Sequence, residues 1–311
     1  MCSDWSSMAA TSARRWYAIS DVIELGPTVK HRSVSQLTTY AQCGESYRLS
    51  KVAKAPERPT AWSIHGSAVH YGIEEYELSH RDMTAEQAQE LALGYYDKGI
   101  AEELEQNPDY ARWLTGGNKK GETDIADRRK LVSDQTKIYI DYAEAHSDEW
   151  RVWPVGPKGM ACELEFTIDI GGVRVLGYID QIREYRDGRI APIDIKTGTK
   201  DPGSAMQLGV YAKAIEENMG VRPESGAFFF PRIQRNGTLK GEVWHDLTLW
   251  DDDLLAREFS SFDKAERAGI YIASPSDFCR VCSQQDNCRV KGVPGIKERY
   301  AEITERPQRA S

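Results

Sequence analysis

The sequence predicts an α/β protein in which helices flank a central β-sheet. Apolar residues at helical spacing dominate the chain up to about residue 150. After Trp153 the pattern changes to short runs of nearly alternating apolar residues, separated by Gly-Gly and by Asp-Gly. The chain has 311 residues, of which 40% are hydrophobic and 28% charged, and this composition is typical of a folded globular protein. The length predicts one large domain or a core with a helical insertion.

Four helices are expected in the first half of the chain. The first is interrupted at Cys43-Gly44, so we expect a short helix followed by a turn. The last two are joined by a polar loop, TGGNKKGETD, and form a helical insertion at about residues 84–148. The four predicted starting points are Ser35, the candidate N-cap Ser67, Thr84 and about Ile125. Residues 1–32 lack a steady period, so we expect a poorly ordered extension there and folded sequence from Ser33.

The second half of the chain begins with three β-rich runs, CELEFTIDI, VRVLGYIDQI and IAPIDI. Short turns join them, which predicts an antiparallel meander. Helices are expected at residues 204–218 and about 251–268, with strands at 226–230 and 242–247 between them. The last helix leads into a cysteine-rich segment.

One hairpin in the meander carries two aspartates and a lysine. Its strands are joined by the loop RDG, whose glycine suits the left-handed position. In the register that this loop sets, Asp180 lies opposite Asp194, with Cα atoms about 4.5–5.5 Å apart. Lys196 projects from the same face, because it is two residues beyond Asp194. Two close carboxylates repel each other unless a proton or a cation lies between them, and a divalent metal meets that need. With a lysine nearby, such a site suits phosphodiester hydrolysis.

The alternative interpretation is an ordinary hairpin that carries these side chains on its exposed face as a solvated salt bridge. The surroundings favour a metal site. Ile179, Ile193 and Ile195 make the other face of the hairpin apolar. Gly177 and Gly198 bracket the charged residues, where a close backbone approach is useful.

Cysteines form a second candidate site. The segment FCRVCSQQDNC holds three of the six cysteines at C-x2-C-x5-C spacing, which is a strong metal signal. Four thiolates suit either tetrahedral zinc or a four-iron, four-sulfur cluster, and spacing alone favours zinc slightly, because structural zinc sites are commoner. Cys162 is interpreted as a core residue and Cys2 as part of the tail. The four candidate ligands are Cys43, Cys279, Cys282 and Cys288.

Together these motifs resemble the RecB-like PD-(D/E)XK nucleases. G-Y-I-D, ending at Asp180, and D-I-K-T-G, beginning at Asp194, look like the core of that family. His70 lies on an upstream helix, where the family has a metal-ligating histidine. Gln207 and Tyr211 match its Q-x-x-x-Y helix and share one helical face. One cysteine before the core and three after it resemble the iron–sulfur subgroup, which includes the AddB nucleases and the CRISPR-associated RecB-like exonucleases.

The resemblance covers about residues 33–292 and implies a restriction-endonuclease-like fold, a mixed sheet flanked by helices. The nuclease core lies at about 160–250, and a 4Fe-4S cluster held by residues 43 and 277–290 joins the N- and C-terminal segments, followed by a tail at 293–311. Gly44 departs from the subgroup, where a proline is frequent. The implied ligands of a catalytic Mg²⁺ or Mn²⁺ are His70, Asp180, Asp194 and the carbonyl of Ile195. The resemblance implies Lys196 as the catalytic lysine. It also implies that Gln207 and Tyr211 contact DNA or brace this lysine.

Three acidic residues near these motifs have open roles. Glu74 is one turn beyond His70, where it orients the imidazole, contacts a metal through water, or is a helix-surface charge. Glu163 and Glu165 alternate on the strand before the hairpin, so one of them is a candidate for an additional carboxylate at the site. The sequence does not choose between them.

The implied activity is digestion of DNA from free or single-stranded ends, in recombination, repair or CRISPR adaptation, with DNA and proteins of those processes as partners. The alternatives are a non-catalytic DNA-binding or assembly subunit, or the same nuclease with structural zinc. A formal charge of −8 argues against indiscriminate coating of nucleic acid but allows a local basic groove. Lys119 and Lys120, with residues 128–130, either line a passage for a DNA strand or form a solvated face. No apolar run has the length of a signal peptide or membrane span, so we expect a cytoplasmic protein with no membrane partner.

Overall fold

The structure is a computed structural model that describes residues 31–290 of the chain. The expected C-terminal tail at 293–311 and all but two residues of the expected extension at 1–32 lie outside the described residues. Across the described part, none of the helices combines the length and the apolar character needed to cross a lipid bilayer.

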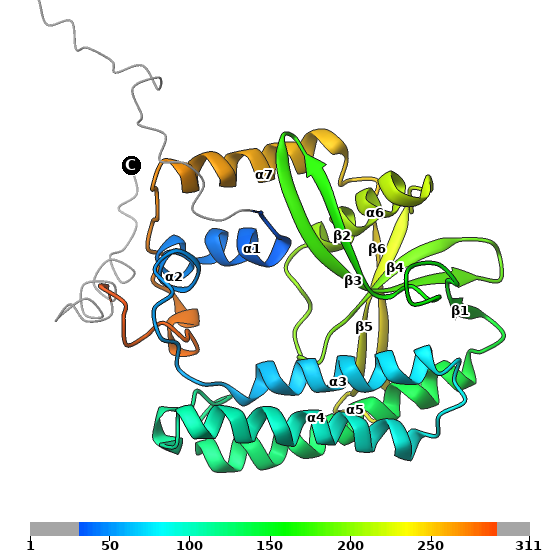
Figure 1. The fold of residues 1–311 in the computed structure, drawn as a ribbon, viewed down its shortest axis with the longest axis horizontal. Coiled ribbons are helices and arrows are strands. Elements are labelled where there is room, and N and C mark those ends of the chain that lie inside the picture. The colour runs from blue at the N-terminus through cyan, green and yellow to red at the C-terminus, as the bar shows by residue number, and fades with distance from the viewer. Residues whose placement is uncertain (1–30, 291–311) are drawn as a thin grey trace, which may run out of the picture.

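A six-stranded mixed sheet forms the centre of the fold (Figure 1). Its order is β1-β3-β4-β5-β6, and β2 also pairs with β3. The three β-rich runs form the predicted antiparallel meander β2-β3-β4, whereas β4 and β5 are parallel. The RDG loop sets the expected register, with Gln181 opposite Ile193 and Gly188 at φ 86°. The strands are β1 (Trp150–Val152), β2 (Cys162–Ile170), β3 (Val173–Tyr185), β4 (Ile190–Ile195), β5 (Ser225–Ile233) and β6 (Leu239–Asp246).

Helices flank this sheet on two sides, which confirms the predicted α/β class (Figure 1). The helices α3, α4 and α5 pack on one another as one layer, and α1, α2, α6 and α7 lie on the other side. The helices are α1 (Val34–Gln42), α2 (Gly44–Tyr47), α3 (Ala61–Leu78), α4 (Ala85–Gln106), α5 (Gly121–Ala145), α6 (Met206–Met219) and α7 (Asp252–Arg267). Short helical turns occur at Arg48–Val52, Tyr110–Arg112 and Asp277–Arg280.

Two predicted helix starts are wrong, because the helices begin earlier. Ser67 lies inside α3, which starts at Ala61, since the preceding turn also presents a buried face that includes His65. The fourth predicted helix starts at Gly121 instead of about residue 125. Thr84 is the N-cap of α4 as expected, and its hydroxyl accepts a backbone N–H in a capping box.

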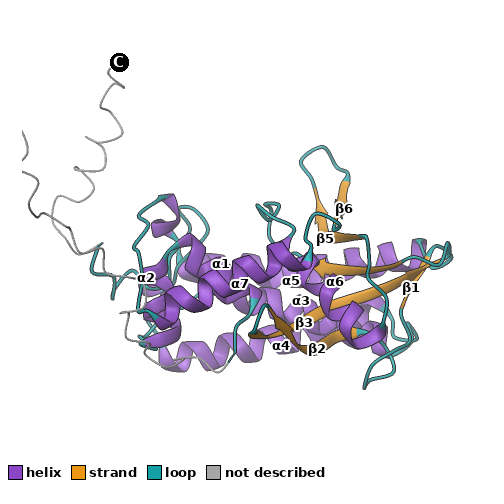
Figure 2. Cartoon of the chain, turned by 90° about the horizontal axis from the view of Figure 1, so that it is seen from above, coloured by secondary structure: helices purple, strands orange, loops and turns teal. Residues whose placement is uncertain are grey.

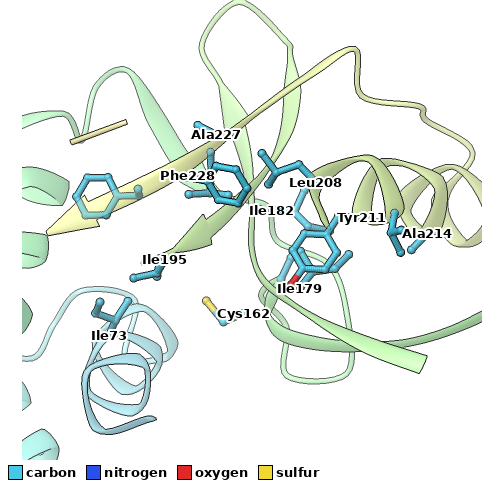
Figure 3. Packing of buried hydrophobic residues seen from close by; sticks show 14 of the residues in the cluster. Ile73, Cys162, Ile179, Ile182, Ile195, Leu208, Tyr211, Ala214, Ala227 and Phe228 are labelled. Carbon is cyan, nitrogen blue, oxygen red and sulfur yellow. The ribbon is translucent and has the colours of Figure 1, made fainter. Parts of the chain in front are cut away.

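The core lies between the sheet and the helices α3 and α6 (Figure 3). Ile73 of α3, Ile195 of β4 and Leu208 of α6 are all buried. A buried ion pair closes one end of this core, where the guanidinium of Arg32 lies 2.7 Å from a carboxylate oxygen of Glu266 on α7. The segment directly before α1 is therefore tied to α7.

Candidate metal centre

The candidate site lies where β3 and β4 separate. Their ladder stops at the pair Gln181–Ile193, one position before Asp180 and Asp194. Beyond that point β3 continues as the partner of β2. The N–H of Ile195 donates to Oδ2 of Asp180 over 2.7 Å. A carboxylate therefore replaces a backbone acceptor at the end of the ladder and is fixed beside β4.

Asp194 and Lys196 form a braced pair on this site. Asp194 is 1% exposed, so the interpretation of a solvated salt bridge on an exposed face is wrong. The Lys196 Nζ atom lies 2.5 Å from Oδ2 of Asp194 and donates to Oε1 of Gln207 over 3.0 Å. The Gln207 amide donates to the hydroxyl of Tyr211 over 2.8 Å, and that hydroxyl donates to Oδ1 of Asp194 over 3.3 Å. These contacts favour bracing over DNA contact as the role of Tyr211, whose side chain is buried.

His70 enters the site from α3 and contacts acceptors with both ring nitrogens. Nδ1 lies 3.0 Å from Glu163 Oε1 and 3.6 Å from Asp180 Oδ2, and Nε2 lies 3.0 Å from the carbonyl oxygen of Ile195. A carbonyl and ionised carboxylates only accept hydrogen bonds, so both nitrogens donate and the ring is an imidazolium. Burial alone lowers the pKa of His70, but the charges of Asp180, Glu163 and Asp194 outweigh it and raise the pKa to about 9.

The structure selects Glu163, and not Glu165, as the additional carboxylate. Glu163 has a left-handed φ of 44°, which turns its side chain toward His70, whereas Glu165 accepts a hydrogen bond from Tyr178 over 2.8 Å. No signal in the sequence distinguishes the two glutamates, because both alternate onto the same strand face. Glu74 pairs with a lysine on a neighbouring loop instead of orienting the imidazole, so it is a helix-surface charge.

The donor atoms fit a hard divalent cation. Single ligand atoms of His70, Glu163 and Asp180 all lie within 4.8 Å of one another. Burial and the charge of Asp194 raise the pKa of Asp180 to about 7, although the nearby His70 lowers it, so a further positive charge would stabilise the ionised carboxylate. The buried Oδ2 of Asp194 lies 2.5 Å from the Lys196 ammonium, so this carboxylate is ionised and can also bind a cation. Oxygen-rich donor sets of this kind suit Mg²⁺ or Mn²⁺.

A buried polar chain behind the site was not foreseen from the sequence. The Gln135 amide of α5 donates to the carbonyl of Thr197, directly after the lysine, over 3.0 Å. Oε1 of Gln135 lies 2.7 Å from Nε2 of His65 and must be the acceptor, so His65 is protonated on Nε2. Burial, and then the charges of Arg128 and Arg232, lower the pKa of His65 to about 4, which keeps the ring neutral. This chain fixes the backbone that follows Lys196.

The two cysteine-bearing segments lie against each other. The hydroxyl of Ser46 lies 3.6 Å from the sulfur of Cys282. Cys43 and Cys279 sulfurs accept backbone N–H groups over 3.5 and 3.4 Å. The departure at Gly44 has a physical reason, since a Cβ atom there would lie 2.7 Å from the backbone nitrogen of Ile272. The ends of the described chain therefore meet around Cys43.

The lysines and arginines near the TGGNKKGETD loop are largely paired. Lys119 lies 2.6 Å from Asp127, and Arg129 lies 2.7 Å from Asp97. Arg128 lies 2.7 Å from an aspartate one turn away. These pairs favour a solvated face over a passage for a DNA strand.

Comparison with known proteins identifies one matching family. The sequence model described as the PD-(D/E)XK nuclease superfamily matches residues 31–289. The Gene 69 protein of Mycobacterium phage D29 is 31% identical over 265 residues, and the alignment covers 83% of this chain and 96% of that protein. The Gene 69 protein of Mycobacterium phage L5 is 30% identical over 282 residues, and this alignment also covers 83% of this chain and 96% of that protein. Among solved structures, the crystal structure of SSO0001 shares 16% identity and a TM-score of 0.30, and the match covers 55% of this chain and 72% of that one.

Cation binding is expected to strengthen as the pH rises, because a metal must displace the proton that His70 carries and, below about pH 7, that of Asp180. The Mn²⁺ affinity should rise about tenfold per pH unit for each displaced proton. Mn²⁺ titrations followed by electron paramagnetic resonance from about pH 6 to 8 measure this slope, with Glu165→Gln as the matched control that keeps it. An affinity that is independent of pH over this range would contradict the protonated state assigned to His70.

Gln135→Met is expected to lower about tenfold the rate of any reaction that depends on the position of Lys196, because methionine matches the glutamine in length but cannot donate to Thr197. Mn²⁺ affinity should stay close to that of the parent protein, whereas thermal stability should fall, because the Nε2–H of His65 and the carbonyl of Thr197 lose their buried partner. Gln89→Met is the matched control. The Gln89 amide also donates to a helix carbonyl, that of Ser133, over 3.1 Å, but it does not contact the metal centre. Equal rates for both variants would show that the buried chain does not position the lysine.

Proposed function

The chain belongs to the PD-(D/E)XK nuclease superfamily, and on that premise we propose that it is a Mg²⁺- or Mn²⁺-dependent exonuclease that digests DNA from free or single-stranded ends. The observation that carries the proposal is the convergence of His70, Asp180 and Asp194 with Lys196 at the opening between β3 and β4. The superfamily match supports nuclease chemistry, and the donor atoms support a divalent cation.

Each side chain has a distinct role in this proposal. His70, Asp180, Asp194 and the carbonyl of Ile195 hold the cation, with Glu163 as a further carboxylate. When bound, a divalent cation polarises a phosphoryl oxygen and lowers the pKa of a water molecule. Lys196 stabilises the negative charge that develops on the phosphate, and its hydrogen bond to Gln207 holds the ammonium in place. The low exposure of Asp194 strengthens these electrostatic interactions.

We place the activity in recombination, repair or CRISPR adaptation, as the RecB-like resemblance implies. Single-strand-binding and recombination proteins are the partners that such a nuclease would meet. Two relatives matched over most of their length are encoded by mycobacteriophages, so a role in processing phage or host DNA ends suits the proposal.

We further propose that Cys43, Cys279, Cys282 and Cys288 bind a 4Fe-4S cluster. Contacts between the two segments support this, including Arg58 N–H to the carbonyl of Ser283 at 2.9 Å. The cluster would tie the ends of the nuclease together and act on stability before chemistry.

Asp194→Asn and Lys196→Met are each expected to lower DNA cleavage at least about 100-fold. Asp194→Asn should also weaken Mn²⁺ binding, whereas Lys196→Met should retain it, because the lysine is not a metal ligand. The assay follows end-labelled linear single-stranded DNA, with a closed single-stranded circle that an exonuclease should spare. Lys98→Met, on the exposed surface of α4, is the control with unchanged cleavage.

Cleavage by both site variants at the parent rate would contradict the proposed active site. A parent protein that binds DNA but never cuts it would favour the non-catalytic subunit. Digestion of the closed circle would show that the protein is an endonuclease, because a closed circle has no ends for an exonuclease.

Anaerobic purification is expected to yield a brown protein with about four iron and four sulfide ions per chain. Cys43→Ser should lose the cluster and unfold at a lower temperature, whereas Cys2→Ser should keep both properties of the parent. Metal analysis and the visible absorption spectrum measure the outcome. A colourless parent protein with one zinc ion would contradict the proposed cluster and leave the proposed nuclease activity unaffected.

A further inference from the structure

We propose that a basic surface beside the metal centre, formed by Lys200, Arg232, Arg235 and Lys240, holds the phosphate backbone of the DNA strand that is cut. This inference rests on the proposed nuclease function and assigns the side from which the strand reaches the site. None of these four residues belongs to the sequence motifs or to the metal centre.

Sheet topology places the basic surface next to Lys196. β4 and β5 are parallel, with Asp194 in register with Phe228. The carboxyl ends of parallel neighbours lie at the same edge of a sheet, so the segments that follow β4 and β5 lie side by side. Lys200 follows β4, and Arg232 lies at the end of β5.

Lys240 physically joins these two segments. Its Nζ atom donates to the carbonyl of Thr199 over 3.3 Å and lies 2.6 Å from a carboxylate oxygen of Asp201. Its ammonium also lies 3.5 Å from the centre of the Phe230 ring. The β5–β6 hairpin is therefore fixed against the loop that begins at the catalytic lysine.

The basic surface has cations that no described carboxylate neutralises, although its Lys240 pairs with Asp201. Figure 2 shows the β5–β6 hairpin projecting from the body of the molecule. Lys200 and Arg235 are exposed, and neither forms an ion pair with any described residue. The Nε atom of Arg232 is buried and has no hydrogen-bond partner. These unpaired donors contrast with the paired cations near the TGGNKKGETD loop.

The charge distribution around the metal centre indicates the side from which a DNA strand approaches. The stretch from Arg232 to Lys240 has three basic residues and no acidic one, in a chain with a net charge of −8. On the opposite side of the metal centre in the order of strands, β2 presents the exposed carboxylate of Glu165. A phosphate backbone is attracted to the β5–β6 side and repelled from the β2 side. The strand is therefore expected to cross the hairpin and end at Lys196.

The double variant Lys200→Ala/Arg235→Ala tests this surface, because both side chains are exposed and their loss should leave the fold intact. Binding of fluorescein-labelled single-stranded DNA is measured by anisotropy in Ca²⁺ at several salt concentrations. The variant is expected to bind at least about tenfold more weakly at low salt and to lower the salt slope by about 1.4, since each phosphate contact on a single strand contributes about 0.7.

The matched control is Lys98→Ala/Arg257→Ala, which removes two exposed cations from α4 and α7. It should retain the affinity and the salt slope of the parent. A Lys200→Ala/Arg235→Ala protein with the parent affinity and slope, in a parent that binds and cleaves DNA, would overturn the surface alone. A parent protein that neither binds nor cleaves DNA would overturn the surface and the proposed function together.

Discussion

The separation of β3 from β4 is the constraint on which the site depends. Backbone groups at the end of a ladder need new partners, and Asp180 supplies one by accepting the N–H of Ile195 over 2.7 Å. The carbonyl of the same residue turns to His70, 3.0 Å away. In a continuous ladder, the N–H and the carbonyl of Ile195 would both form hydrogen bonds with β3. The opening therefore produces two metal-directed oxygen positions from one break in the sheet, while the pairing of β4 with β5 keeps that break rigid.

Electrostatic compensation then shapes the surroundings of the break. Burial and mutual repulsion raise the pKa of Asp180 to about 7, and the imidazolium of His70 is the positive group that lies among the carboxylates. Lys196 provides a second positive charge from the side of α6, where Gln207 and Tyr211 hold it. A divalent cation would take over the compensating role of the histidine. The acidic β2 side and the basic β5–β6 side extend this asymmetry beyond the site.

Local sequence signals predicted the parts of the site that depend on strand alternation and turn chemistry. The RDG loop fixes the register of the hairpin as far as Gln181 and Ile193. The predicted pair of Asp180 directly opposite Asp194 is not formed, because the two strands separate at that point. The sequence did not distinguish Glu163 from Glu165, because glutamate rarely adopts the left-handed backbone that Glu163 has and so gives no signal of it. Gln135 was not foreseen, since its bond to the backbone after the lysine joins residues far apart in the chain. The early start of α3 was missed for the same reason, as its first turn is stabilised by packing.

A crystal structure of the protein grown with Mn²⁺, with anomalous scattering recorded at the manganese edge, tests the central claim most directly. We expect one strong anomalous peak between β3 and β4, bound by His70, Asp180, Asp194 and the carbonyl of Ile195, with Glu163 beside it. The imidazole should then have lost its contact with the carbonyl of Ile195, because both become ligands of the same ion. Manganese bound elsewhere, or bound without both aspartates, would contradict the claim that the opening of the sheet builds the metal centre.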